Sequence, residues 1–124
     1  MSKIIRSFLF VPADSEKKLA KACNLGADAL ILDLEDAVLP ANKDRGRDLC
    51  ASFLRNAKTD AQIWVRVNPL DTEHFIDDMR AVVPLAPAGI VLPKPDGPVD
   101  IETISRGLDT FEQKHGLEPG GIKI

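Results

Sequence analysis

The sequence has few of the residues on which several common kinds of site depend. Cys23 and Cys50 are its only cysteines, and neither belongs to a CxxC pair or a Cys/His cluster, so the sequence suggests neither a zinc site nor a disulfide framework. This cysteine usage fits a reduced compartment, and we expect a cytoplasmic protein. His74 and His115 fall at predicted helix surfaces or ends, where neither has a neighbour that would make it a catalytic base or a metal ligand.

An excess of positive charge and long apolar runs are also missing. A net charge of -3 and a pI near 5.3 give no broad positive field, so we expect neither nucleic acid nor an anionic membrane surface as a partner. The apolar runs are much shorter than the roughly 18 residues that indicate a membrane span. An anionic substrate would therefore be held by a few local cations.

The pattern that is present alternates strands and helices four times. Each predicted strand is a short apolar run, and each predicted helix carries apolar residues at helical spacing. Asp14 or Ser15 can cap the first helix, and Pro84 and Pro87 end the third. The strands are expected at 7–11, 29–32, 63–67 and 89–92, and the helices at 16–26, 43–57, 75–82 and 101–116.

Alternation with buried strands predicts an α/β fold with right-handed parallel crossovers, either a doubly wound sheet or a (β/α)₈ barrel. A barrel of eight units needs about 250 residues. The chain instead has about four units and ends in Ile122-Lys123-Ile124, which is typical of a strand that has just begun. We therefore predict that 1–124 is the amino-terminal portion of one TIM-barrel domain, with its first four to five strands, in a truncated chain.

Polar residues stand where three predicted strands end. Asp33, Glu35 and Asp36 follow the second strand, Arg66 lies in the third, and Lys94 follows the fourth. In parallel sheets these ends share one edge, so the acidic and basic groups should converge. Clustered carboxylates can help to hold Mg²⁺, directly or through its waters. The alternative is a cluster that caps the next helix.

The two cations also have two interpretations each. The planar fork of Arg66 suits a substrate carboxylate or a developing oxyanion. It could equally form a structural ion pair with Glu35 or Asp36, and both roles can coexist. Lys94 could provide a second cation for the substrate, or belong to a solvated Pro-Lys-Pro turn.

Four segments, taken in order, resemble the HpcH/HpaI aldolase family, which contains citrate lyase beta subunits, malyl-coenzyme A lyases and citramalyl-coenzyme A lyases. Each segment alone is a weak signal, and the ordered set is specific. They are Arg6-Ser7-Phe8-Leu9-Phe10-Val11-Pro12, residues 26–38 around Leu32-Asp33-Leu34-Glu35-Asp36, Arg66-Val67-Asn68, and Leu92-Pro93-Lys94.

This resemblance implies roles for several residues. Arg66 would bind the keto-acid portion of the substrate, and Glu35 and Asp36 would lie beside a Mg²⁺ ion and its waters. Lys18 falls near a basic position that contacts coenzyme A, and Lys43 and Arg47 match a further basic pattern. The family's direct metal ligands would follow Ile124. Glu102 belongs to the fourth predicted helix and is not expected to replace them.

The implied reaction is Mg²⁺-dependent cleavage of a 3-hydroxy-acyl thioester, or its reverse, by a carbon–carbon lyase. Small-molecule coenzyme A thioesters or keto acids would be its partners, in a homo-oligomer or a citrate lyase complex. A metal-dependent aldolase that uses free pyruvate is the enzymatic alternative. A phosphoacceptor receiver domain is more remote, because the first strand ends in Phe10-Val11-Pro12 without an acidic pair. We expect the isolated 124-residue chain to be inactive.

Overall fold

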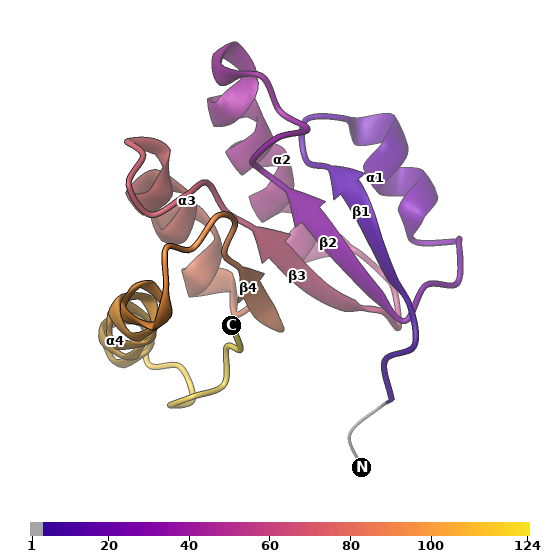
Figure 1. The fold of residues 1–124 in the computed structure, drawn as a ribbon. Coiled ribbons are helices and arrows are strands. Elements are labelled where there is room, and N and C mark those ends of the chain that lie inside the picture. The colour runs from indigo at the N-terminus through magenta and orange to yellow at the C-terminus, as the bar shows by residue number, and fades with distance from the viewer. Residues whose placement is uncertain (1–3) are drawn as a thin grey trace.

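A parallel β-sheet of four strands forms the centre of the protein. The computed structural model describes residues 4–124, and it contains β1 (Phe8–Pro12), β2 (Ala29–Asp33), β3 (Gln62–Arg66) and β4 (Gly89–Val91). Each strand pairs in parallel with the next, in the order β1-β2-β3-β4 (Figure 1). The predicted α/β class with parallel strands is confirmed.

The strand order separates the two architectures that the sequence left open. In a doubly wound sheet the order reverses at a switch point, as it does in receiver-like folds. Here the spatial order follows the chain order, as in the wall of a (β/α)₈ barrel. A doubly wound sheet, and with it a receiver domain, is therefore wrong for the described part of the chain.

Four α-helices connect or follow the strands. Ser15 caps the first helix as predicted, since its side chain accepts a hydrogen bond from the Lys18 backbone N–H. The helices are α1 (Glu16–Ala22), α2 (Lys43–Asn56), α3 (His74–Val82) and α4 (Pro98–Lys114), with 3₁₀ turns at Pro40–Asn42 and Val83–Leu85. In residues 4–124, no helix is long and apolar enough to cross a membrane.

The largest difference from the predicted ranges is at the end of the first helix. The apolar spacing predicted that the first helix continues to Gly26, but α1 ends at Ala22 and short turns follow. Gly26 itself has φ of 76°, a left-handed conformation that glycine adopts readily. The end of the chain agrees better, because Lys123 forms a parallel bridge with Gly89 at the position of a fifth strand.

The hydrophobic core lies between the sheet and the helices. Alternate residues of the strands, Val11, Leu30, Leu32, Val65 and Ile90, point into it, and all are almost completely buried. All four helices contribute apolar side chains to the same cluster. They are Leu19 and Ala22, Cys50 and Phe53, Phe75, Met79 and Val82, and Ile104 and Leu108.

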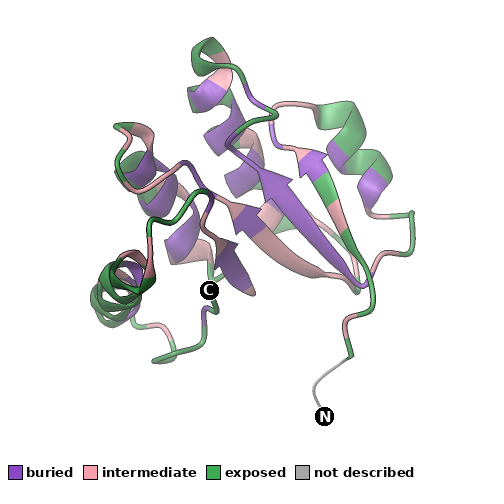
Figure 2. Cartoon of the chain, in the orientation of Figure 1, coloured by how far each residue is buried: buried purple, intermediate pink, exposed green. Residues whose placement is uncertain are grey.

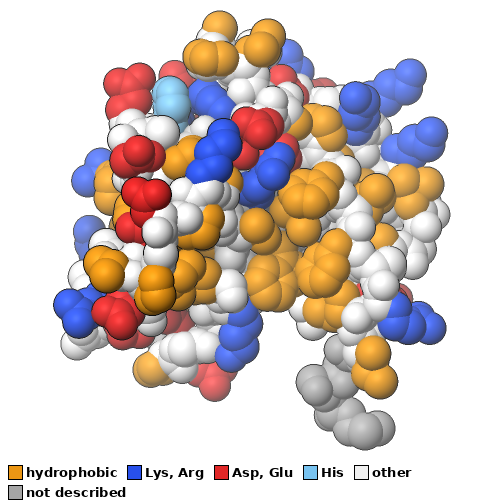
Figure 3. Space-filling model, viewed as in Figure 1, with side chains coloured by type: hydrophobic (Ala, Val, Ile, Leu, Met, Phe, Trp, Pro, Cys, Tyr) orange, Lys and Arg blue, Asp and Glu red, His pale blue; other side chains and the backbone are white. Residues whose placement is uncertain are grey.

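The opposite face of the sheet is open. Phe8 and Phe10 are about half exposed there, at 52% and 50%, although both are large and apolar. In Figure 2 most residues of β1 and β3 are coloured exposed or intermediate, and the helices lie behind the sheet or beside β4. Figure 3 shows hydrophobic side chains over the open face, with acidic and basic side chains next to them.

Candidate functional site

The registers of the strands bring the polar residues to one edge of the sheet. Asp33 and Arg66 are partners in the pairing of β2 and β3, so their side chains leave the open face of the sheet as neighbours. Glu35 and Lys94 follow β2 and β4 at the same edge and are joined by a hydrogen bond. The structure therefore brings together Asp33, Glu35, Arg66 and Lys94, as the strand-end pattern predicted.

Asp33 and Arg66 form the tightest pair of this cluster. The Arg66 Nε lies 2.9 Å from Asp33 Oδ1, and Nη2 lies 2.7 Å from Oδ2. Burial alone would raise the pKa of Asp33, but the hydrogen bonds from Arg66 and from the Glu35 N–H lower this pKa below its ordinary value. The pKa of Arg66 is raised, chiefly by its hydrogen bond to Asp33.

The structural partner expected for Arg66 was therefore only partly right. Glu35 or Asp36 was predicted, but the main partner is Asp33, and Glu35 Oε1 is 3.7 Å from Arg66 Nε. The guanidinium also lies over the ring of Phe10, with its Cζ 4.7 Å from the ring centroid. The side chain of Arg66 keeps 23% of its surface exposed, so it can still meet a ligand.

Glu35 is buried and incompletely paired. Its Oε2 accepts a hydrogen bond from Lys94 Nζ at 2.8 Å. Its Oε1 accepts none from the described residues, although it is inaccessible to solvent. Buried polar atoms are rarely left in this state. Glu35 Oε1 therefore fits a donor that this part of the chain does not provide, such as a metal-bound water or a substrate hydroxyl.

Lys94 connects the two acids that follow β2. Its Nζ is 3.5 Å from Asp36 Oδ1, and its hydrogen bond to Glu35, with the charge of Asp36, raises the pKa of the lysine. The backbone of Lys94 has φ of 48°, a left-handed conformation that is costly for a side chain with a Cβ. Lys94 is 65% exposed, yet it is anchored, which differs from a freely solvated turn.

Asp36 and the helix-cap alternative can now be assessed. The side chain of Asp36 is 67% exposed and reaches the cluster through Lys94. Neither Glu35 nor Asp36 caps α2, whose N-cap residue is Asn42. The capping explanation is therefore wrong. Instead, Asp33 accepts hydrogen bonds from the N–H groups of Glu35 and Ala37 and so fixes the turn after β2.

Lys43 and Arg47 have buried roles that their basic pattern did not reveal. Lys43 Nζ donates to the carbonyl oxygens of Leu34 and Glu35, both at 2.8 Å. Burial lowers the pKa of this lysine. Arg47 Nε donates to Asp78 Oδ1 at 2.8 Å. Both cations hold protein atoms beneath the candidate site.

Asp78 is the residue that the sequence interpretation missed. It is fully buried in α3, and its Oδ2 accepts hydrogen bonds from the Asn68 N–H and from Asn68 Nδ2. The available signal was its position on the apolar face of the helix, next to Met79. His74 also contacts Arg47, with its Nδ1 3.2 Å from Arg47 Nη2.

Lys18 does not join the cluster. It lies on the exposed face of α1, and its backbone N–H donates a hydrogen bond to the side chain of Ser15. Glu102 is an exposed residue of α4, as expected. Of the predicted site residues, Arg66, Glu35, Asp36 and Lys94 are thus brought together, and Lys18 is separate.

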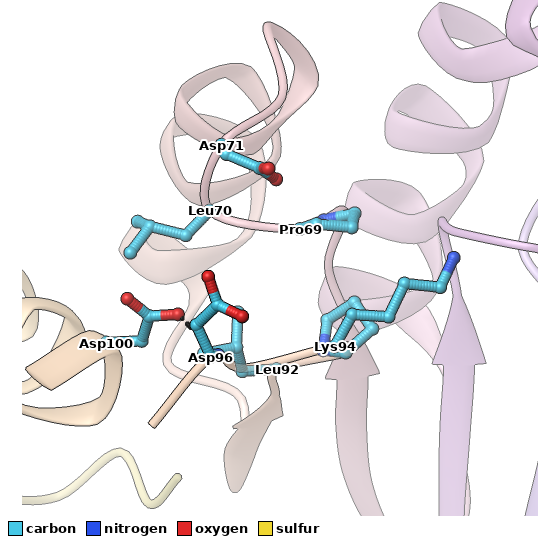
Figure 4. A pocket seen from close by; sticks show the side chains of 8 residues that line it. Pro69, Leu70, Asp71, Leu92, Lys94, Asp96 and Asp100 are labelled. Atoms are coloured by element: carbon cyan, nitrogen blue, oxygen red, sulfur yellow. Dashed lines mark hydrogen bonds between the residues drawn. The ribbon is translucent and has the colours of Figure 1, made fainter. Parts of the chain in front are cut away.

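A cleft of about 260 Å³ adjoins the cluster between the loops that follow β3 and β4. Figure 4 shows Asp71, Asp96 and Asp100 around it, whereas the ammonium of Lys94 points away from these acids and toward β2. Asp100 accepts a hydrogen bond from the Asp96 N–H and so closes the turn before α4. Within residues 4–124, no group of three or more His, Cys, Asp or Glu side chains could hold a metal ion.

The fold and the site define an α/β protein with a charged cluster at the carboxyl edge of a parallel sheet. The model of the HpcH/HpaI aldolase/citrate lyase family matches residues 6–124. The chain belongs to this family.

The chain is similar in sequence to named relatives over most of its length. It is 40% identical over 101 residues to a (3S)-malyl-CoA thioesterase of Cereibacter sphaeroides, covering 81% of this chain and 35% of the relative. It is 36% identical over 120 residues to the citrate lyase subunit beta of Escherichia coli K12, covering 96% and 40%. The chain thus spans about two fifths of the length of these relatives or less.

Solved structures give the same result. The citrate lyase beta subunit of Mycobacterium tuberculosis, complexed with oxaloacetate and magnesium, matches with a TM-score of 0.66 and 31% identity, covering 78% of this chain and 42% of the other. A malate synthase of Haloferax volcanii matches with a TM-score of 0.84 over 98% of this chain and 40% of its own. At 22% identity, the second likeness concerns the fold alone.

Proposed function

We propose that this chain supplies the amino-terminal portion of the TIM-barrel domain of a Mg²⁺-dependent carbon–carbon lyase, which cleaves or forms a citryl-, malyl- or citramalyl-CoA-type thioester. The observation that carries the proposal is the meeting of Asp33, Glu35, Arg66 and Lys94 at the carboxyl edge of the sheet. Active sites of barrel enzymes are built at this edge. The oxaloacetate and magnesium bound by the M. tuberculosis relative support the same chemistry.

Arg66 is the proposed group for the keto-acid portion of the substrate. Asp33 engages Nε and Nη2, while Nη1 donates to none of the residues 4–124. A guanidinium held in this way presents a positive charge and a free N–H without having to reorganise. The negative charge on the oxygen that becomes the keto group, present once the hydroxyl proton is removed and before the carbon–carbon bond breaks, would be stabilised at this atom. Asp33 orients the group and balances its charge.

Glu35 and Asp36 are the proposed partners of the waters around a Mg²⁺ ion. Mg²⁺ usually keeps several waters, and carboxylates beside it accept their hydrogen bonds. Glu35 Oε1, which accepts no hydrogen bond from residues 4–124, fits such a donor. When bound, the ion would act as a Lewis acid on the hydroxy or keto oxygen of the substrate. In this proposal Lys94 holds the carboxyl group of Glu35 through its hydrogen bond to Oε2.

Lys94 and Lys18 remain candidate contacts for the thioester. Lys94 has most of its surface exposed beside Glu35, so it can reach a second anionic group of the substrate. Lys18 is exposed on α1, where a coenzyme A phosphate would have access to it. Both are proposed binding residues, and Arg66, Glu35 and Asp36 are the proposed catalytic ones.

The direct test uses the complete reading frame that contains these residues. The purified product should cleave or condense at least one of the citryl-, malyl- and citramalyl-CoA thioesters when Mg²⁺ is supplied, and chelation should abolish turnover. No reaction across this panel would rule the proposal out. Turnover of the free acids without coenzyme A would instead identify the pyruvate-type aldolase.

Arg66→Lys is the matched site variant for this assay. It keeps the charge but cannot reproduce the forked contact with Asp33 while it also binds a ligand. We expect kcat/KM to fall by about 100-fold or more, as for the loss of one oxyanion donor. The exposed Lys58→Met, at the far end of the sheet, should leave kcat/KM within about twofold.

A further inference from the structure

Most of the buried polar groups lie in one part of the molecule. Among residues 4–124, eight polar or charged residues are buried, and six of them adjoin the carboxyl edge of the sheet. Burial of such groups is unfavourable unless each is hydrogen-bonded, and a core of apolar residues would be simpler to stabilise. The six are Asp33, Glu35, Lys43, Arg47, Asn68 and Asp78.

The hydrogen bonds of this group converge on one short segment, residues 33–37. On the carbonyl side, Lys43 Nζ holds the oxygens of Leu34 and Glu35, and Asn68 Nδ2 donates to the Leu34 oxygen at 3.1 Å. On the N–H side, Asp33 accepts from Glu35 at 2.9 Å. The main chain that carries the Glu35 side chain is thus held from both sides.

One of these donors, the side chain of Asn68, is held in turn by side chains of α3 and α2. Asn68 is held by Asp78, whose Oδ2 lies 2.6 Å from Asn68 Nδ2. Asp78 is held by Arg47 at 2.8 Å, and Arg47 also contacts Asp44 at 2.7 Å. Lys43 and Arg47 are one helical turn apart in α2, so this helix supplies both cations from a single rigid element.

We propose that Lys43 is a positioning residue: by holding the carbonyl groups of Leu34 and Glu35, it sets the place of the Glu35 carboxylate opposite Arg66 and Lys94. The predicted effect of Lys43 on turnover rests on the proposed function, whereas its effect on the position of the Glu35 carboxylate does not. The hydrogen bonds of the Lys43 ammonium go to main-chain oxygens, and it acts through the main chain. The carboxylate is sensitive to such an effect because, within residues 4–124, its side chain accepts a hydrogen bond at Oε2 alone, from Lys94, while Oε1 lies 3.7 Å from Arg66 Nε.

The first experiment measures kcat and KM of Lys43→Met in the complete enzyme, per folded protein. A misplacement of about 1 Å can reduce a rate by about 100-fold, so we expect kcat to fall by about 10- to 100-fold, with KM within about threefold. Lys43→Arg keeps a charged donor and should recover most of the rate, and Lys58→Met should not alter it. A kcat within about twofold of wild type in folded Lys43→Met would overturn the proposal.

The second experiment does not require catalysis. In the full 124-residue chain, ¹³C resonances of the Leu34 and Glu35 carbonyl groups and of the Glu35 carboxyl group are compared between wild type and Lys43→Met. All three should move. A carboxyl resonance that stays in place while the two carbonyl resonances move would make Lys43 merely structural and would refute the positioning role.

Together, the two measurements distinguish a failure of the proposed function from a failure of the positioning role of Lys43. If wild-type enzyme turns over no thioester, the proposed function fails and the carboxyl resonance alone decides the role of Lys43. If Lys43→Met does not fold, Lys43→Gln retains a shorter donor and is submitted to both measurements with the same criteria.

Discussion

Asp33 has the largest number of hydrogen bonds in the candidate site. It accepts two from Arg66 and one each from the backbone N–H groups of Glu35 and Ala37. An ionised carboxylate is the form that can accept all four. The charge of Asp33 therefore contributes both to the orientation of Arg66 and to the turn that carries Glu35.

This contribution predicts a pH dependence for Asp33→Asn. Because the pKa of Asp33 is lowered in the folded protein, its stabilisation is present above the unfolded value of about 3.9 and is lost as pH falls through the folded pKa. At pH 7 the variant should lose about 1 to 3 kcal/mol of unfolding free energy. Urea titrations between pH 7 and 2.5 measure the difference from wild type.

The difference should stay constant from pH 7 to about pH 5 and should narrow below about pH 4. The exposed Asp109→Asn in α4 is the matched control, and it should change stability by less than about 0.5 kcal/mol. A difference between wild type and Asp33→Asn that does not change over the acid range would contradict the assignment.

At the residue scale, the sequence predicted which groups gather but not how they pair. Strand-end positions were enough to bring Arg66, Glu35 and Lys94 together. The choice of Asp33 as the partner of Arg66 depends on the register of β2 against β3, which leaves no local mark in the sequence. Asp78 was missed for a related reason, since its partners are far away along the chain. The catalytic and binding roles remain predictions.

At the scale of the elements, the open face of the sheet is organised in layers across the strands. Phe10, Ile31, Trp64 and Gly89 follow one another in register from β1 to β4. A Cβ atom at Gly89 would overlap the ring of Trp64, so the bulky residue in β3 requires the absence of a side chain in β4. This pairing of large and small is typical of packed barrel interiors.

Gly89→Ala should therefore destabilise the protein. Overpacking of this kind costs about 1 to 3 kcal/mol, because the indole must move away from its neighbours. Thermal unfolding with tryptophan fluorescence measures both the stability and the environment of Trp64, the single tryptophan. Gly107→Ala is the control, since its added Cβ meets nothing within 4 Å in α4, and it should stabilise by about 0.5 to 1 kcal/mol. Equal effects at the two glycines would contradict this explanation.

Most elements could be predicted from local signals. Apolar runs and capping residues identified four strands and four helices, and α2 begins at the expected residue and ends one residue earlier than expected. The end of α1 was misjudged because Cys23 and Leu25 continue an apolar spacing that the chain uses in turns. Periodicity records which side chains can be buried, whereas hydrogen bonds decide where the helix stops.

At the scale of the whole molecule, the open face of the sheet should govern both the activity and the self-association of the isolated chain. Phe8 and Phe10 lie half exposed on it, and exposed sheet edges invite association. We predict that purified 1–124 cleaves no thioester and self-associates as its concentration rises. Assays with Mg²⁺ and the thioester panel, beside sedimentation velocity, measure both. Turnover by this chain would overturn the first expectation.

Phe8→Lys tests the second expectation. It puts a charge on the exposed face, away from the polar cluster, and should shift the association to higher concentration. Lys58→Met should leave it unchanged. Association that is identical in Phe8→Lys and wild type would show that another surface is responsible.

The sequential order of the strands has a consequence for how the protein acquires its structure. Within residues 4–124, each strand pairs only with the strands next to it along the chain, so these pairings can form in the order of synthesis. Each parallel pairing must still close a loop that contains a helix, and the entropy lost in closing this loop slows the formation of the sheet. On the ribosome, β1 and β2 could pair before β4 is synthesised, and the sheet would grow in the direction of translation.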